Sequence, residues 1–226
     1  LVFTDKTRET TVRSLRFDET FTLGASGIGD VVTVIKYQLV SPSILSPFAL
    51  AVGGGASLPT GSFTKEQGTS RLAIDLQPGT GAAALLGWVF AMHGFPEFGI
   101  RFYATATYRY SGTNFHSYRI GDEYNLTIGG EYTLDDHFIG SLLLRSRFAS
   151  ADFADRRILS ATGGTYHDLM PGFSYTDGPS QLRLFAQLPI YRNVRGRQLT
   201  LSYLLGVEYS YVFDFSNAGS PPIADP

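Results

Sequence analysis

The sequence predicts an all-β fold, a transmembrane antiparallel up-and-down β-barrel of about ten strands. Three observations favour it. Long segments alternate apolar and polar residues with a period of two. The apolar face of these segments ends in aromatic side chains, and the connections between segments alternate between long and short. A soluble β-sandwich also alternates, but its strands average only about five or six residues.

The alternation divides the chain into successive strands. They are expected at Arg13–Leu23, Val31–Leu39, Phe48–Leu58, Ala82–Met92, Ile100–Tyr110, Glu123–Leu134, Phe138–Phe148, Thr165–Thr176, Gln181–Ile190 and Leu199–Phe215. The first is the weakest, because Asp18 and Glu19 interrupt it, and it could instead belong to an outer loop. A single-chain bacterial barrel has an even number of strands, so the set is complete at about ten or upstream strands bring it to about twelve.

The connections predict how the strands are oriented. Leu58–Thr80, Ser111–Asp122 and Ser150–Gly163 are long, whereas Asp135–Asp136 and Asp177–Ser180 are short. Membrane barrels have long outer loops and short periplasmic turns. This places the C-terminus in the periplasm.

The domain organisation is simple. Residues 1–215 are interpreted as one outer-membrane barrel and residues 216–226 as a C-terminal periplasmic tail. Pro221, Pro222 and Pro226 prevent the tail from extending the last strand. No signal peptide is present, although export requires one, so we expect that the chain is processed or begins partway through a longer protein.

Composition excludes several classes of function. The formal net charge is -2, which argues against a nucleic-acid partner, and the absence of cysteine excludes disulfides and Cys-ligated zinc. No window of about 18 apolar residues provides a transmembrane helix. No cofactor, metal site or catalytic group is expected. The four histidines are scattered, and although His137 follows Asp136 and His167 precedes Asp168, no second catalytic group is fixed by spacing.

The polar faces predict a charged lumen. The residues expected to form a constriction are Arg101, Arg109, Glu123, Glu131, Arg145, Arg147, Arg183 and Glu208. Antiparallel pairing should bring Arg109 near Glu123 and Arg101 near Glu131, and Arg145 or Arg147 can approach from the next strand. Pairing is expected because unpaired buried charges are prohibitively costly. Two interpretations stay open: the network plugs and stiffens the barrel, or it forms a narrow passage.

The apolar faces predict contact with lipid at both interfaces, where amphipathic rings are favoured. Toward the outer side lie Tyr108, Tyr110, Tyr124 and Tyr203, and toward the periplasm lie Phe102, Tyr132, Tyr209, Tyr211 and Phe213. The expected partners are the lipid bilayer, lipopolysaccharide and the barrel-insertion machinery. A further periplasmic or outer-membrane protein partner is left open.

Six motifs are spread over most of the chain. They are SGIGDVVTVIKYQL at Ser26–Leu39, SLPTG at Ser57–Gly61, LQPGTG at Leu76–Gly81, GDEYNLTIGGEY at Gly121–Tyr132, GGTYHDLMPGFSY at Gly163–Tyr175 and QLPIYRNVRGRQLT at Gln187–Thr200. With them the sequence resembles the outer-membrane transporter-like family named for the meta-pathway of phenol degradation. The pair SLPTG and LQPGTG is the most specific. The resemblance implies a barrel of the bacterial outer membrane with a role in uptake.

These observations lead to a ranked set of functions. The first is a narrow channel or facilitated-uptake barrel for small molecules, with apolar or aromatic molecules as candidate substrates. The alternative is a structural barrel that holds a partner and conducts little. An outer-membrane hydrolase is the third.

Overall fold

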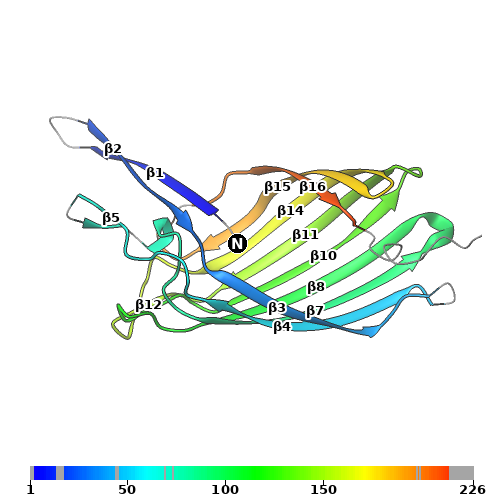
Figure 1. Cartoon of the computed structure of the whole chain (residues 1–226). Helices are drawn as coiled ribbons and strands as arrows, with labels where there is room; N and C mark the ends of the chain where they lie inside the picture. The colour runs from blue at the N-terminus through cyan, green and yellow to red at the C-terminus, as the bar shows by residue number, and fades with distance from the viewer. Residues whose placement is uncertain are drawn as a thin grey trace, which may run out of the picture.

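The structure is a computed structural model, and it describes residues 3–13, 18–43, 46–68, 70–72, 74–196, 198 and 200–213. Its main element is an antiparallel sheet of nine strands. The strands are β3 (Val31–Val40), β4 (Phe48–Leu58), β7 (Ala84–Phe95), β8 (Ile100–Ser111), β10 (Glu123–Thr133), β11 (Phe138–Ala149), β14 (Gly164–Asp177), β15 (Ser180–Val194) and β16 (Leu204–Tyr211). Each strand pairs with the next one along the chain, so the predicted up-and-down order is confirmed. Figure 1 shows the strands tilted side by side and curled into a trough.

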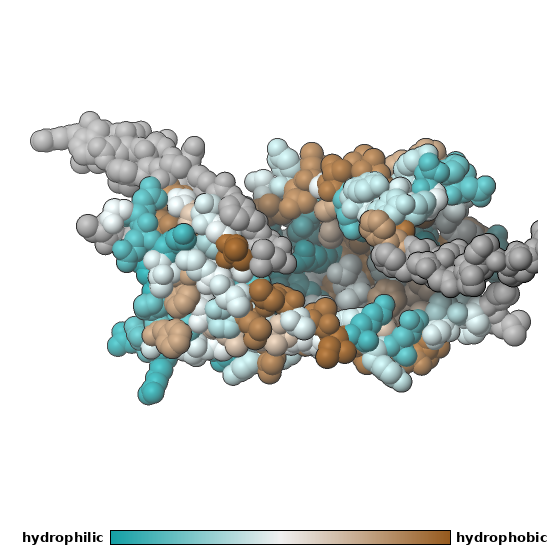
Figure 2. Space-filling view, in the orientation of Figure 1, coloured by the Kyte–Doolittle hydropathy of each residue, from teal (hydrophilic) through white to brown (hydrophobic). Residues whose placement is uncertain are grey.

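The two faces of this sheet differ as the period-2 pattern predicts. On β10, Tyr124, Leu126 and Ile128 are exposed on the convex face, whereas Glu123 and Thr127 are half-buried on the concave face. Figure 2 shows hydrophobic residues gathered along the middle of the molecule, with hydrophilic ones toward both ends. The large apolar side chains therefore point away from the interior, which is the reverse of a soluble domain.

The connections lie at two ends of the sheet. At one end, here called the loop end, lie residues 59–83, 112–122, 150–163 and 195–203; at the other, the turn end, lie 41–47, 96–99, 134–137 and 178–179. The alternation of long and short connections is thus observed. The loop end also holds short elements, namely β5 (Glu66–Gln67), β6 (Ser70–Arg71), η1 (Ile74–Leu76), β9 (Tyr118–Arg119), β12 (Phe153–Ala154) and β13 (Arg157–Ile158), and the turn end holds η2 (Pro96–Phe98).

The predicted first strand, Arg13–Leu23, is wrong. The structure has β1 (Phe3–Arg13) and β2 (Asp18–Ile28), which pair with each other as a separate two-stranded sheet and place Arg13 opposite Asp18. Figure 1 shows this hairpin projecting from the loop end and leading into β3. The interruption at Asp18 and Glu19 marks the start of the second arm of a hairpin.

Other strands agree with the prediction within a few residues, except that the last one is shorter than Leu199–Phe215. The edges of the sheet are β3 and β16, and no ladder joins them among the described residues. Closure of the barrel and an even strand number stay predictions. The tail, residues 216–226, lies outside the described residues. Among those described, no helix has the length and apolar character needed to cross a membrane.

Candidate functional site

Two ion pairs cross neighbouring strands on the concave face. Arg101 Nη2 donates to Glu131 Oε2 at 3.1 Å, and Arg147 Nη1 donates to Glu123 Oε2 at 3.4 Å. Asn125 lies opposite Arg147 in register, and its Nδ2 donates to Glu123 Oε1 at 2.8 Å. All four charged side chains are a quarter to a half exposed, so each pair contributes about 1 kcal/mol or less.

The other charged residues of the predicted constriction also lie on the concave face, but without ion pairs to their opposite neighbours. Arg109 lies opposite Glu123, which instead binds Arg147. Arg145 lies opposite Asp168. Arg183 lies opposite Glu208, and its guanidinium is 5.7 Å from the centroid of the Phe185 ring. Their role in limiting passage stays a prediction.

The predicted interface aromatics gather at the two ends of the convex face. Tyr108 and Tyr124 are paired in register with ring centroids 4.6 Å apart, toward the loop end. Tyr110 is there too, with Arg119 over its ring at 4.7 Å. The members nearer the turn end are Phe102, Tyr132, Tyr209 and Tyr211, all exposed on strands; Tyr203 and Phe213 are exposed just outside β16. The contact of these rings with lipid stays a prediction.

One strand gives the concave face an apolar strip that sequence reasoning missed. Leu86, Trp88, Phe90 and Met92 of β7 pair in register with concave-face residues of β8, and together they are called the β7 strip. A Cβ on Gly53 would lie 2.3 Å from the Trp88 ring, so the glycine makes room for the indole. The strip was hidden because β7 is apolar on both faces, so a period-2 pattern cannot separate them.

The most specific sequence motifs meet at one carboxylate at the loop end. Asp30 Oδ1 accepts a hydrogen bond from Gly61 N at 2.9 Å, and Oδ2 accepts from Thr80 N at 2.9 Å and Thr80 Oγ1 at 2.6 Å. A Cβ on Gly79 would lie 2.6 Å from the Gly61 backbone, so neither position has room for a side chain. The motifs therefore fasten both ends of the connection 59–83 to the start of β3.

The connection 59–83 has a small core of its own. Gln77 is 1% exposed; its Nε2 donates to Lys65 O at 2.9 Å and Leu72 O at 3.0 Å, and its Oε1 accepts from Lys65 N at 2.9 Å. Leu72 and Leu76, which lie close to Gln77 in the sequence, are also buried. The segment is thus a folded cap that presents Arg71 to the space beneath it.

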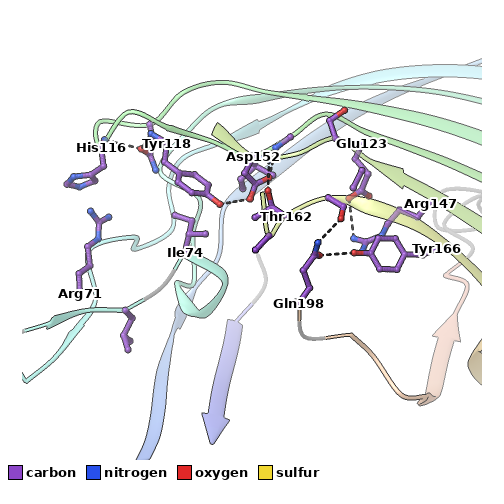
Figure 3. A pocket seen from close by; sticks show the side chains of 18 residues that line it. Arg71, Ile74, His116, Tyr118, Glu123, Arg147, Asp152, Thr162, Tyr166 and Gln198 are labelled. Atoms are coloured by element: carbon purple, nitrogen blue, oxygen red, sulfur yellow. Dashed lines mark hydrogen bonds and ion pairs between the residues drawn. The ribbon is translucent and has the colours of Figure 1, made fainter. Parts of the chain in front are cut away.

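A cavity of about 780 Å³ lies at the loop end, bounded by this cap, three further connections and the ends of β10, β11 and β14. Figure 3 shows Arg71 and His116 on one side of it and Glu123, Arg147 and Tyr166 on the other. The cavity is therefore lined by both charge signs and by aromatic rings. We call it the vestibule.

Asp152 holds the connections of the vestibule together. Its carboxylate accepts hydrogen bonds from the Tyr118 hydroxyl and, at 2.8 Å, from Gly121 N, while its own N–H donates to Thr162 Oγ1 at 2.8 Å. Burial, and then the hydrogen bond to Asp152, raises the pKa of Tyr118. The phenol thus stays protonated, and this bond persists, at neutral and moderately alkaline pH.

Gln198 brings the connection between β15 and β16 to the edge of the vestibule. Its Oε1 accepts from the Tyr166 hydroxyl at 3.1 Å, and its Nε2 donates to Gly163 O at 2.7 Å and Arg195 O at 2.8 Å. The Arg147 guanidinium lies 4.2 Å from the centroid of the Tyr166 ring. Tyr166 is therefore held at its hydroxyl by Gln198 and at the face of its ring by Arg147 (Figure 3).

His167 does not meet the carboxylate that follows it. It lies on the convex face of β14, whereas Asp168 lies on the concave face opposite Arg145. Its Nδ1 is instead 2.9 Å from Ser146 Oγ, between the rings of Phe148 and Tyr191. The Ser–His pair has no acidic third member from Asp168, so the arrangement expected of a hydrolase is not assembled there.

Comparisons with known proteins agree on fold and family. The structure is similar to the crystal structure of an outer-membrane channel from Pseudomonas putida F1, with a TM-score of 0.70, 13% identity and coverage of 86% of this chain and 73% of that chain. No curated protein matches the chain in sequence. A sequence model of the family described as "Putative MetA-pathway of phenol degradation" matches residues 4–206. With most of its length matched, the chain belongs to this MetA-pathway family.

Proposed function

We propose that this chain is a β-barrel channel of the bacterial outer membrane that takes up small apolar or aromatic molecules. The membrane location is supported by the convex face, where Ile35, Leu205 and Val207 are 72–74% exposed. Each buried Å² of apolar surface contributes about 25 cal/mol, so such a face is far more stable against lipid than against water. The likeness to an outer-membrane channel supports the same location.

The β7 strip is the observation that carries the substrate class. Trp88 shares its register row with Thr107, Asn125 and Arg147, so along this row the inner surface changes from aromatic on β7 to polar on β8, β10 and β11. A channel for inorganic ions has no need of a half-buried indole on its inner wall, because apolar surface binds them weakly. An aromatic solute gains from stacking there, since aromatic pairs contribute about 0.5–1.5 kcal/mol beyond the burial of area.

Uptake by whole cells tests the proposal. Cells that lack their general porins and express this chain should take up the apolar fluorophore N-phenyl-1-naphthylamine faster than cells with an empty vector. Trp88→Ala should lower that rate several-fold while raising ion conductance in planar bilayers, because the indole both binds the solute and occupies space. Val89→Ala, on the convex face of the same strand, is the matched control and should change neither quantity. A rate that equals the empty vector, with the folded protein present in the outer membrane, would exclude the uptake function.

The same measurements separate the other two functions. A structural barrel should neither conduct nor take up the fluorophore, yet should retain a protein partner during purification. A hydrolase should release fatty acid or peptide products, and His167→Ala should abolish that release. His167 is a defined control for the hydrolase assay because it contacts Ser146 on the convex face. Asp168 does not complete a catalytic triad with this pair.

A further inference from the structure

We propose that the concave face holds a carboxylate-binding subsite, in which Arg145 and Arg192 bind the acid group of an amphipathic substrate. The inference rests on the uptake function and narrows its substrate class. It starts from a second cavity, of about 220 Å³, that adjoins the vestibule through the shared residues Arg147 and Tyr166. That volume equals roughly seven waters at about 30 Å³ each, enough for a hydrated carboxylate.

Three guanidinium groups line this cavity against one carboxylate. Arg147 already binds Glu123 and the Tyr166 ring. The carboxylate is Asp168, which is 7% exposed and accepts a hydrogen bond from Gln187 Nε2 at 2.7 Å. Within the described part of the chain, neither Arg145 nor Arg192 forms an ion pair or a side-chain hydrogen bond. Three arginines, Arg145, Arg147 and Arg192, and two carboxylates, Glu123 and Asp168, leave a balance of one positive charge.

A β-bulge places Arg192 in this position. On β15, Pro189 lies opposite Asp168 and Tyr191 lies opposite His167, so Ile190 is an extra residue. Successive strand residues alternate between faces, so one inserted residue turns every later side chain to the other face. Without it, Arg192 would point to the convex face. With it, Arg192 lies opposite Tyr166 on the concave face, next to the row of Arg145 and Asp168.

Apolar side chains lie beside the subsite, on the side of the turn end. Leu143 is two residues before Arg145 on the same face of β11, and it is 6% exposed. Met170 lies opposite Leu143 on β14, and Phe185 follows on β15 opposite Gly172. A solute with its acid group at Arg145 and Arg192 therefore has an apolar wall for its body. The matching class is a small carboxylic acid with an aromatic or aliphatic chain.

Arginine is suited to this task because its planar fork donates two parallel hydrogen bonds to a carboxylate. In a space partly closed to water, such charge-assisted bonds are roughly twice as strong as neutral ones. An uncharged amide of equal shape receives no charge assistance. The subsite therefore predicts a preference for the acid over the amide.

Channel block in planar bilayers tests the preference, with 4-phenylbutanoate and 4-phenylbutanamide as probes. Wild-type channels should be half-blocked by the acid at a concentration at least about tenfold below that for the amide, a ratio that corresponds to about 1.4 kcal/mol. The double variant Arg145→Gln/Arg192→Gln should bring the two concentrations together. Arg101→Gln, which removes another concave-face arginine outside this cavity, is the matched control and should keep the wild-type ratio. Heat-modifiable migration on gels checks that each variant is folded.

The outcomes distinguish the subsite from the channel. Equal block by acid and amide in the wild type, or a preference that survives in the double variant, would overturn the subsite and leave the uptake function standing. A fall in the ratio for Arg101→Gln as large as for the double variant would also overturn it, because general charge would then explain the preference. If the wild type neither conducts nor takes up fluorophore, the channel fails. Calorimetric titration of the detergent-solubilised protein then still decides whether the acid binds and the amide does not.

Discussion

Substituting Asp30 by alanine should release the cap over the vestibule without unfolding the sheet. The carboxylate accepts hydrogen bonds from Gly61 N, Thr80 N and Thr80 Oγ1, and these two residues are the two ends of the folded segment. Alanine leaves the N–H groups of Gly61 and Thr80 without their acceptor, whereas the Thr80 hydroxyl can still donate to Ala82 O at 3.1 Å. The ladder between β3 and β4 does not involve this side chain, so the sheet should keep its stability.

The size of the effect follows from the number and kind of bonds lost. A hydrogen bond to a charged group contributes about 1.5–3 kcal/mol, but Asp30 is half-buried and water can replace part of its bonding. A net loss of about 2–4 kcal/mol is therefore expected. Since about 1.4 kcal/mol is tenfold in an equilibrium constant, the cap should open about 30 to 700 times more often.

Hydrogen–deuterium exchange measures this opening directly, because amides in a locally stable segment exchange through such events. Exchange of peptides from residues 59–83 should accelerate by that factor in Asp30→Ala, while peptides from β10 and β11 stay unchanged. Thr60→Ala is the graded control: it removes one exposed hydrogen bond, from Val31 N at 2.9 Å, and should accelerate exchange about fivefold at most. If Asp30→Ala changes exchange no more than Thr60→Ala does, the carboxylate does not hold the cap.

Two further predictions concern the wall and its orientation. Gly53→Ala should displace the Trp88 indole and destabilise the fold by about 1–3 kcal/mol, because the new Cβ would overlap the ring. The fluorescence emission maximum of Trp88, the only tryptophan, should then shift. Gly87→Ala is the control: its Cβ meets nothing within 4 Å, so the emission maximum should stay unchanged. An identical spectrum for both variants would show that the indole does not rest on Gly53. In intact cells, a thiol reagent should label Phe115→Cys, a position 91% exposed at the loop end, but should label Asp136→Cys at the turn end only after the outer membrane is breached. The reverse labelling pattern would invert the proposed orientation.

Most of the sheet could be predicted because its two faces carry different residue types. From Glu123 to Thr133 every second residue is apolar or glycine, and from Glu123 to Ile128 the observed exposure alternates in the same phase. Strand register was also within reach, since Arg101 lies opposite Glu131 as antiparallel pairing required. The sequence also allowed Arg145 or Arg147 to approach from the next strand, but it could not decide that Glu123 pairs with Arg147 rather than with Arg109. Both arginines lie on strands adjacent to Glu123, and side-chain reach decides between them.

Two kinds of feature could not be predicted from the sequence. One is a single inserted residue that moves later side chains to the other face of the sheet, and the other is a segment whose two faces do not differ in polarity. The bulge at Ile190 looks like ordinary alternation in the sequence, yet it decides the face of Arg192. The β7 strip is apolar on both sides, so no pattern assigns Trp88 to the concave face. The hairpin of β1 and β2 is mixed in polarity, and within the part of the chain that the structure describes its arms form a ladder only with each other.

The carboxylate that gathers both ends of the cap has a consequence for how this molecule can be altered. Most of the entropic cost of a long loop comes from bringing its two ends together. Each doubling of the loop length adds only about 0.6 kcal/mol to that cost. Because Gly61 and Thr80 are joined through Asp30, the residues between them, apart from Gly79, can be shortened, lengthened or exchanged without disturbing the register of β3 and β4. The cap is thus an interchangeable module: a foreign segment grafted between these two residues would redesign the entrance while the wall beneath it is kept.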